Sequence, residues 1–126
     1  MQILIKTIRA ENAGLYRIKD GRRILFARPQ TRIELYEDVK EIPVLGAAAC
    51  KVRKRRAVLV LCSGIAAGMA ELEDTLMFEM IADIQRPDGV YERIHFNRLI
   101  PQEIDLDGEW KFETELPEGW GNLWIP

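Results

Sequence analysis

The sequence predicts a mainly β fold, an antiparallel β-sandwich or barrel of about seven or eight short strands with one short helix. Apolar and polar residues alternate with a period of two in several separate runs, as they do in strands with one buried face. Turn residues separate these runs at roughly regular spacing, which is typical of a sandwich or barrel. Only residues 65–74 show apolar residues at helical spacing, so alternating β/α units are not expected.

Length and composition fit one domain. The chain has 126 residues, of which 48% are hydrophobic, so we expect residues 1–126 to form a single β domain with its own core. The net charge of −2 gives no global attraction to nucleic acid or to anionic lipid. The longest apolar run, residues 57–62, is too short to cross a bilayer, and residues 1–5 lack the basic start of a secretory signal. We therefore expect no membrane partner.

The first quarter of the chain predicts three strands. Residues 2–9 form an N-terminal strand or arm that is apolar on both faces, and residues 11–14 are expected to break it. Residues 15–19 and 22–28 then flank Asp20-Gly21. Asp-Gly is a strong signal for a two-residue hairpin, because both turn positions need a positive φ.

The next stretch leads to the predicted centre of the sheet. Residues 31–37 alternate again, and Pro43 places residues 38–46 at an edge or a bulge, because proline cannot donate a ladder hydrogen bond. The dense basic run at residues 51–56 follows. It leads into AVLVLC at residues 57–62, a continuous aliphatic run that predicts a strand buried on both faces.

The clearest hairpin occupies residues 75–100, with its turn at residues 86–89. We predict that it is the central pair of the sheet. The residues expected on its buried face are Leu76, Phe78, Met80, Ala82, Ile84, Val90, Ile94, Phe96 and Ile100. Its opposite face is only partly polar, so the apolar residues there are candidate contacts with another subunit: Met77, Ile81, Tyr91 and Leu99.

The C-terminal part predicts a polar connection at residues 101–108, a weak strand at residues 110–116 and a tail at residues 117–126. The tail carries Trp120 and Trp124. Exposed indole rings are unfavourable in water, so the tail should dock either on its own core or on a neighbouring subunit.

No residue set in the sequence predicts catalysis. His95 is the only histidine and has no triad pattern around it, and one histidine with two distant cysteines does not make a zinc site. We expect no enzyme activity, no metal and no cofactor. Cys50 and Cys62 form no CxxC motif and are expected to be buried, reduced thiols.

The basic run is the one polar feature with several possible roles. It contains Lys51, Arg53, Lys54, Arg55 and Arg56. Three interpretations stay open: a solvated strand face, a contact with the acidic surface of an adjacent subunit that includes residues 103–109, and a phosphate contact with nucleic acid. The slight overall acidity, and the lack of aromatic residues within the run, disfavour nucleic acid.

Five segments follow one another in a characteristic order. They are a strand with a DG turn at residues 14–21, a strand that ends in a hydrophobic-Leu-Gly step at residues 33–46, the basic run at 51–56, a late hairpin at 75–104 and an acidic closing strand at 110–117. This order resembles that of contractile-tail phage tail tube proteins, or of a related small tail component. The family usually carries a Gly-Thr-rich stretch after the basic segment, where this chain is aliphatic.

The resemblance implies a β-sandwich subunit that assembles with copies of itself into rings, commonly hexamers, which stack into a tube. Other tail proteins would be its partners, and DNA would pass through the lumen without specific binding. It also implies a place in the virion tail after assembly in the bacterial cytoplasm. The alternative hypothesis is a small β-fold binding module that contacts nucleic acid or an acidic protein through residues 51–56.

Overall fold

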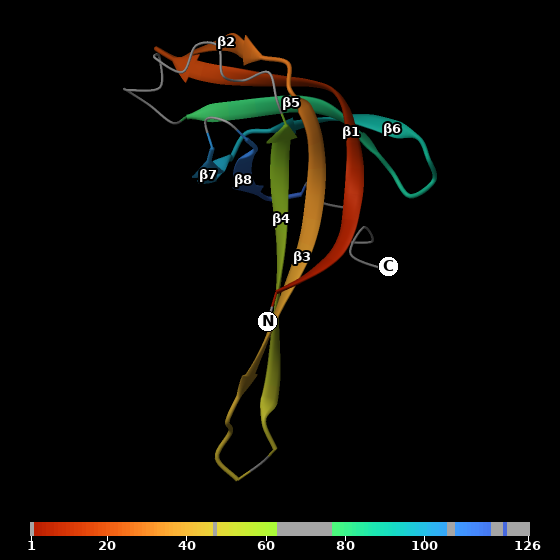
Figure 1. Ribbon diagram of the computed structural model, residues 1–126, viewed down its shortest axis with the longest axis vertical. Helices are drawn as coiled ribbons and strands as arrows, with labels where there is room; N and C mark the ends of the chain where they lie inside the picture. Colours follow the sequence, from red (N-terminus) through yellow and green to blue (C-terminus); the bar gives the residue numbers. More distant parts are fainter. Residues whose placement is uncertain (1, 47, 63–76, 106–107, 117–119, 121–126) are drawn as a thin grey trace.

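The computed structural model describes residues 2–46, 48–62, 77–105, 108–116 and 120. These residues contain eight strands: β1 (Gln2–Lys19), β2 (Arg22–Ala27), β3 (Gln30–Ile42), β4 (Cys50–Cys62), β5 (Phe78–Gln85), β6 (Tyr91–Phe96), β7 (Ile100–Ile104) and β8 (Trp110–Thr114). All of them belong to one antiparallel sheet with the order β6-β5-β1-β3-β4-β8-β7, and β2 pairs with β1 (Figure 1).

The predicted fold class is confirmed at the level of a mainly β, antiparallel architecture of eight strands. The alternative of a closed barrel is wrong, because the sheet keeps open edges. The helix expected over residues 65–74 lies outside the described residues.

β1 joins the two halves of the sheet. Its first half, as far as Ala10, pairs with β3, and its second half pairs with β5 on one side and β2 on the other. The register shifts between Glu11 and Gly14, and Asn12 has a φ of 52°. The break expected at residues 11–14 is therefore wrong. The strand bends and continues, because asparagine tolerates the left-handed conformation and β5 keeps pairing on both sides of the bend.

The bend lets the sheet curl around one core. Three strands separate β5 from β8, which in a flat sheet would place them about 19 Å apart at about 4.8 Å per strand. Yet the ring of Phe78 on β5 lies 6.2 Å from that of Trp110 and 5.8 Å from that of Phe112, both on β8. Phe26 of β2 joins this cluster at 5.5 Å from Phe78. The two ends of the sheet therefore face each other across a shared aromatic core.

β4 is buried on both faces along residues 57–61, as the aliphatic run predicted. Alternation places Leu59 with the core, whereas Val58 and Val60 face outward and are still buried. The neighbouring strands β3 and β8 supply long side chains on that outer face, so β4 lies in the interior of the sheet.

Both predicted hairpin turns are confirmed. Asp20 and Gly21 have φ values of 52° and 74° between β1 and β2, and Gly89 has a φ of 87° between β5 and β6. The predicted buried face of β5 is also confirmed, since Phe78, Met80, Ala82 and Ile84 are all buried.

The position of the β5–β6 hairpin differs from the prediction. It is not the central pair: β6 is the last strand at one end of the sheet, and β1, β3 and β4 occupy the centre. β6 also ends at Phe96, so the period-two pattern does not continue beyond it. As a result Leu99 is buried and Ile100 is 60% exposed, the reverse of the expected faces.

The polar connection expected at residues 101–108 contains a strand instead. β7 pairs with β8 from Ile100 opposite Glu113 to Ile104 opposite Trp110, with a register shift between Pro101 and Glu103. Pro101 is tolerated because β7 is an edge strand with one free side, where a missing ladder hydrogen bond costs little.

Candidate interaction surface

A two-stranded ribbon extends from the body of the protein, and we call residues 37–56 the arm. β1 pairs with β3 only as far as Asp38, and β8 pairs with β4 only from Ala57. Beyond these points, among the residues that the structure describes, β3 and β4 pair only with each other, as far as Ile42 opposite Cys50. β3 therefore continues about 13 Å past Asp38, at about 3.3 Å per residue, before the turn that holds Leu45. Figure 1 shows the arm below the curled sheet.

The far end of the arm presents apolar side chains to solvent. Four large ones are exposed there: Ile42, Val44, Leu45 and Val52. Gly46 has a φ of 75°, in the left-handed region that glycine adopts without strain, so the tip turns sharply. The arm therefore ends in an exposed apolar tip.

The arm is basic, whereas the rest of the chain is acidic. Residues 37–56 hold six Lys or Arg and three Asp or Glu, a net charge of +3. Because the whole chain carries −2, the remaining residues carry −5. Two arginines are partly neutralised within the arm, since Arg53 and Arg55 lie 3.3 Å and 3.6 Å from the carboxylate of Glu37. Lys51 and Lys54 form no ion pair with any residue that the structure describes.

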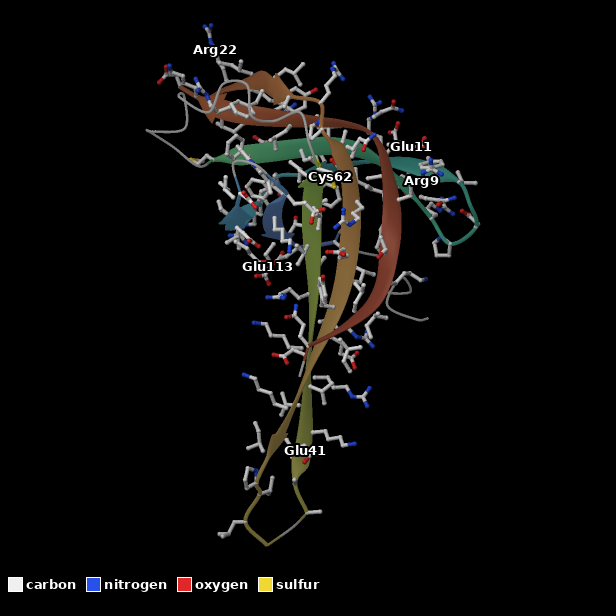
Figure 2. The ribbon with its side chains drawn as sticks, in the orientation of Figure 1. Arg9, Glu11, Arg22, Glu41, Cys62 and Glu113 are labelled. Atoms are coloured by element: carbon white, nitrogen blue, oxygen red, sulfur yellow. The ribbon has the colours of Figure 1, made fainter. Side chains whose placement is uncertain are left out.

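The structure places the predicted basic patch on the arm. Lys51, Arg53, Lys54 and Arg55 are exposed on its β4 strand. Arg56 lies where the arm meets the body, half-buried, with its guanidinium 5.7 Å from the centre of the Tyr36 ring. Figure 2 shows the side chains that project from the arm, with Glu41 labelled on its β3 strand.

The predicted subunit contacts on the hairpin do not form one patch. Met77 is 62% exposed just before β5, Ile81 is half-buried in β5, and Tyr91 begins β6 near the turn. The hydroxyl of Tyr91 donates a hydrogen bond to Glu11 at 3.2 Å.

Two further predicted contacts, Leu99 and Trp120, belong to the buried core of this chain, and Trp124 lies outside the described residues. The structure thus covers Leu99 and Trp120 without a neighbour. A proposed contact surface therefore excludes Leu99 and Trp120.

The second charged surface is acidic, and we call residues 100–116 the acidic ribbon, which comprises β7 and β8. It holds six Asp or Glu and one Lys, a net charge of −5. Trp110 and Phe112 point into the core, so alternation places Glu113 on the outer face of β8, and the exposed Glu115 directly follows the strand. Glu103, opposite Lys111 in the register, shares that face, and its carboxylate lies 3.7 Å from the Lys111 ammonium.

A polar network on the outer face ties β3, β4 and β8 together. The guanidinium of Arg32 lies 2.7 Å from the carboxylate of Glu109, and the thiol of Cys62 donates to the same carboxylate at 3.2 Å. Glu34 lies 3.6 Å from Arg32 and accepts a hydrogen bond from the Tyr36 hydroxyl at 2.9 Å. Sequence spacing could not reveal this network, because its members come from distant segments.

The network shifts the pKa values of Glu109 and Cys62. The hydrogen bond from Arg32 holds the pKa of Glu109 below its ordinary value, and the Cys62 thiol adds to the effect. Burial raises the pKa of Cys62, and its hydrogen bond to Glu109 raises it further. The thiol is therefore a protonated donor rather than a nucleophile. Cys50, by contrast, is exposed on the arm, so the expectation of two buried thiols is wrong for Cys50.

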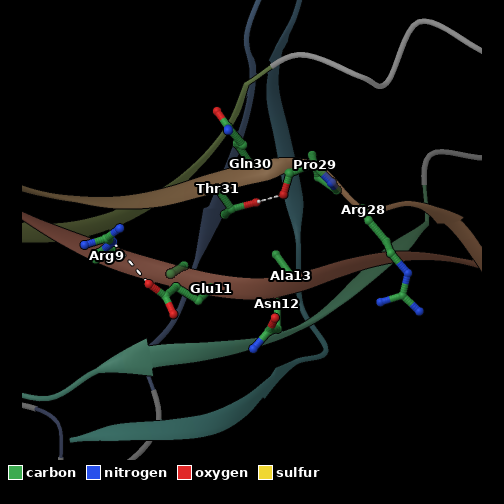
Figure 3. Close-up of a pocket in the computed structure, with 9 residues that line it drawn as sticks. Arg9, Glu11, Asn12, Ala13, Arg28, Pro29, Gln30 and Thr31 are labelled. Atoms are coloured by element: carbon green, nitrogen blue, oxygen red, sulfur yellow. Dashed lines mark hydrogen bonds and ion pairs between the residues drawn. The ribbon is translucent and has the colours of Figure 1, made fainter.

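An open groove of about 670 Å³ lies where β1 bends away from the start of β3 (Figure 3). Two of its polar contacts are internal: Arg9 pairs with Glu11 at 3.3 Å, and the Thr31 hydroxyl donates to the Pro29 carbonyl at 3.1 Å. His95 lies elsewhere, on β6, where it contacts Glu79.

Within the described ranges, no cluster of three or more His, Cys, Asp or Glu side chains has the geometry to hold a metal ion. The same part of the chain holds no helix of the length and apolarity needed to span a bilayer.

Comparison with known proteins gave no family model, no curated protein and no solved structure that matches this chain. The resemblance to tail tube proteins therefore rests on the order of the sequence motifs alone.

Proposed function

We propose that this protein is a structural subunit that assembles with copies of itself into a ring. The observation that carries the proposal is the arm, which leaves the body with its apolar tip and its basic strand exposed. A two-stranded ribbon that packs on nothing is marginally stable in water. Burying its exposed apolar side chains on a neighbour would stabilise both the ribbon and the contact.

The open edges of the sheet support the same proposal. β6 and β7 are the terminal strands, and each has one side without a partner among the described residues. Unpaired edges are surfaces that natural proteins cover, shorten or close by assembly. The exposed Met77, Tyr91 and half-buried Ile81 on and beside the β5–β6 hairpin are proposed as additional contacts near one of these edges.

The order of motifs extends the proposal to a phage or prophage-like tail, in which the ring is one layer of the tail tube. Its partners are then further copies of this chain and, at the ends of the tube, other tail proteins. Hexameric rings are the common case in that family. The tube stands in the virion tail after assembly in the bacterial cytoplasm, and DNA passes through it without specific binding. The aromatic contacts between β5 and β8 support the sandwich architecture that the resemblance to that family implies for this chain.

Light scattering over a concentration series tests the assembly, and electron microscopy of the same samples tests its form. We expect the mean mass to rise with protein concentration to a multiple of the 14.5 kDa chain, and we expect ring-shaped particles. A mass that stays at one chain throughout the series contradicts the proposal.

The basic arm also favours a second candidate, a module that binds nucleic acid or an acidic protein through residues 51–56. Acidic residues interleave with the cations of the arm, and the Glu37 carboxylate already contacts Arg53 and Arg55, which lowers the charge available to phosphate. Titration with duplex DNA at low and at high salt separates the two candidates. Binding that weakens steeply with salt supports the module, and no binding at low salt removes its nucleic-acid form.

A further inference from the structure

We propose that the arm of one copy docks on the acidic ribbon of the next copy, so that the ring is held by a head-to-tail contact between these two surfaces. This inference rests on the proposed self-assembly and names the surfaces that carry it. Both surfaces are strands of the described sheet, the arm from β3 and β4 and the acidic ribbon from β7 and β8.

The charges of the two surfaces are complementary. The arm carries a net +3 and the acidic ribbon a net −5, so most of the acidic excess of the chain lies in the 17 residues of the ribbon. The groups that remain without an ion-pair partner among the described residues also match. They include Lys40 and Lys54, which share one face of the arm, and Glu115 on the ribbon, all of them exposed. Such complementarity orients the two surfaces and disfavours contacts with other proteins.

The apolar groups match as well. Ile100 on β7 is 60% exposed and lies opposite Glu113, so it is an apolar spot within an acidic surface. On the arm, Val52 is exposed opposite Lys40 and on the same face as Lys54, an apolar spot within a basic surface. An interface with an apolar centre and a charged rim is the common anatomy of specific protein contacts.

The acidic ribbon of one copy reaches only the base of its own arm. β8 pairs with β4 from Ala57 to Leu61, and Glu113 lines a small pocket with Lys54 and Arg56. The arm, by contrast, continues β4 beyond this point to Cys50. Figure 1 shows β7 and β8 beside the upper half of β4, away from the arm. Each copy therefore offers two different surfaces, the arm and the acidic ribbon. Such a heterologous contact generates a closed ring when its rotation closes, and a filament when it does not.

Charge reversal in pairs tests the contact. In the arm variant, Lys40→Glu is combined with Lys54→Glu, and in the ribbon variant Glu103→Lys is combined with Glu115→Lys. Each variant alone sets like charges against each other at the substituted positions of every contact. We expect the concentration needed for assembly to rise at least about tenfold in sedimentation velocity experiments.

Mixing the two variants separates a direct contact from a general effect of charge. In an equimolar mixture the glutamates introduced on the arm of one variant meet the lysines introduced on the ribbon of the other, and the unchanged arm and ribbon also meet. We expect the mixture to assemble at the concentration that the parent protein needs, and a chain with all four substitutions to do the same. Arg22→Glu combined with Arg28→Glu is the control, because it changes the net charge as the arm variant does, at two exposed sites outside both surfaces.

The outcomes are distinguishable. If the parent assembles and either charge variant assembles equally well, or if the mixture stays dissociated, the arm does not dock on the acidic ribbon, although the protein still forms oligomers. If the parent itself stays monomeric at every concentration, the proposed function fails and the docking inference fails with it. Circular dichroism spectra identical to that of the parent establish that each variant is folded.

Discussion

Phe78 is the residue on which the curled core depends most directly. It lies on β5, is 3% exposed, and contacts rings from β2 and β8. Truncation would leave a cavity between the two ends of the sheet. We predict that Phe78→Ala lowers the free energy of unfolding by about 3–5 kcal/mol, measured by urea denaturation.

The neighbouring residue gives the matched control for that prediction. Met77 is 62% exposed, and Met77→Ala should change the free energy of unfolding by no more than about 0.5 kcal/mol. Equal losses at the two positions would mean that the aromatic cluster does not hold the ends of the sheet together.

Glu109 gives a prediction about pH. Its pKa is lowered in the folded protein, first by the hydrogen bond from Arg32 and then by that from Cys62. A carboxyl group with a lowered folded pKa contributes stability above its unfolded pKa, and this contribution disappears as the pH falls through the folded pKa. We therefore predict that Glu109→Gln destabilises the protein near neutral pH, and that the difference from the parent shrinks as the pH falls below the ordinary value of 4.5.

Urea midpoints measured for both proteins at several pH values check this prediction. Glu113→Gln is a suitable control, because Glu113 accepts a hydrogen bond from Gln102 rather than from an arginine. A difference between parent and Glu109→Gln that stays constant across the whole range would show that the ionised carboxylate is not the stabilising group.

At this scale the sequence predicted most of the core and less of the surface. The alternation of β5 correctly identified Phe78 and Met80 as buried. Leu99 was misplaced, because the pattern assumed that β6 continued beyond Phe96. The contact of Arg32 with Glu109 joins residues 77 positions apart, so only the paired register of β3, β4 and β8 could have revealed it.

The bend in β1 decides how the strands are distributed. Asn12 has a φ of 52°, and its amide donates a hydrogen bond to Asp83 on β5 at 2.9 Å. Glycine adopts this backbone conformation freely, whereas alanine does not. We predict that Asn12→Ala is less stable than Asn12→Gly by about 1 kcal/mol in urea denaturation, although alanine normally favours strands no less than glycine does.

The comparison of the two substitutions isolates the backbone, because both remove the hydrogen bond to Asp83. If the alanine variant is as stable as the glycine variant or more stable, the bend does not require the left-handed conformation. The sequence did mark residues 11–14 as irregular. It predicted a break because only local residues were considered. The pairing with β5 that continues the strand on both sides of Asn12 involves residues about 70 positions away.

The arm could be predicted only in part. The basic run and the buried strand that follows it were recognised, and together they are β4. Half of β4 leaves the body because β1 stops pairing with β3 at Asp38 and β8 stops pairing with β4 at Ala57. Neither limit has a local signal in the sequence. β7 was missed for a similar reason, since its residues are mostly polar and only pairing with β8 makes them a strand.

At the scale of the whole molecule, we propose that the arm makes this chain assemble. The arm can be shortened without touching the body, because Val39 and Arg53 lie directly opposite each other in the ladder. Replacing residues 40–52 by Asn-Gly would join them through a two-residue hairpin turn, the tightest connection that this register allows. The aromatic core and the sheet order stay as they are in the parent.

Sedimentation velocity of the full chain and of this shortened chain, over the same concentration series, tests whether the arm drives assembly. We predict that the full chain sediments as a closed oligomer at high concentration, whereas the shortened chain sediments as a folded monomer throughout. An oligomer of the same size from both chains, or a monomer from both, would overturn the proposed role of the arm.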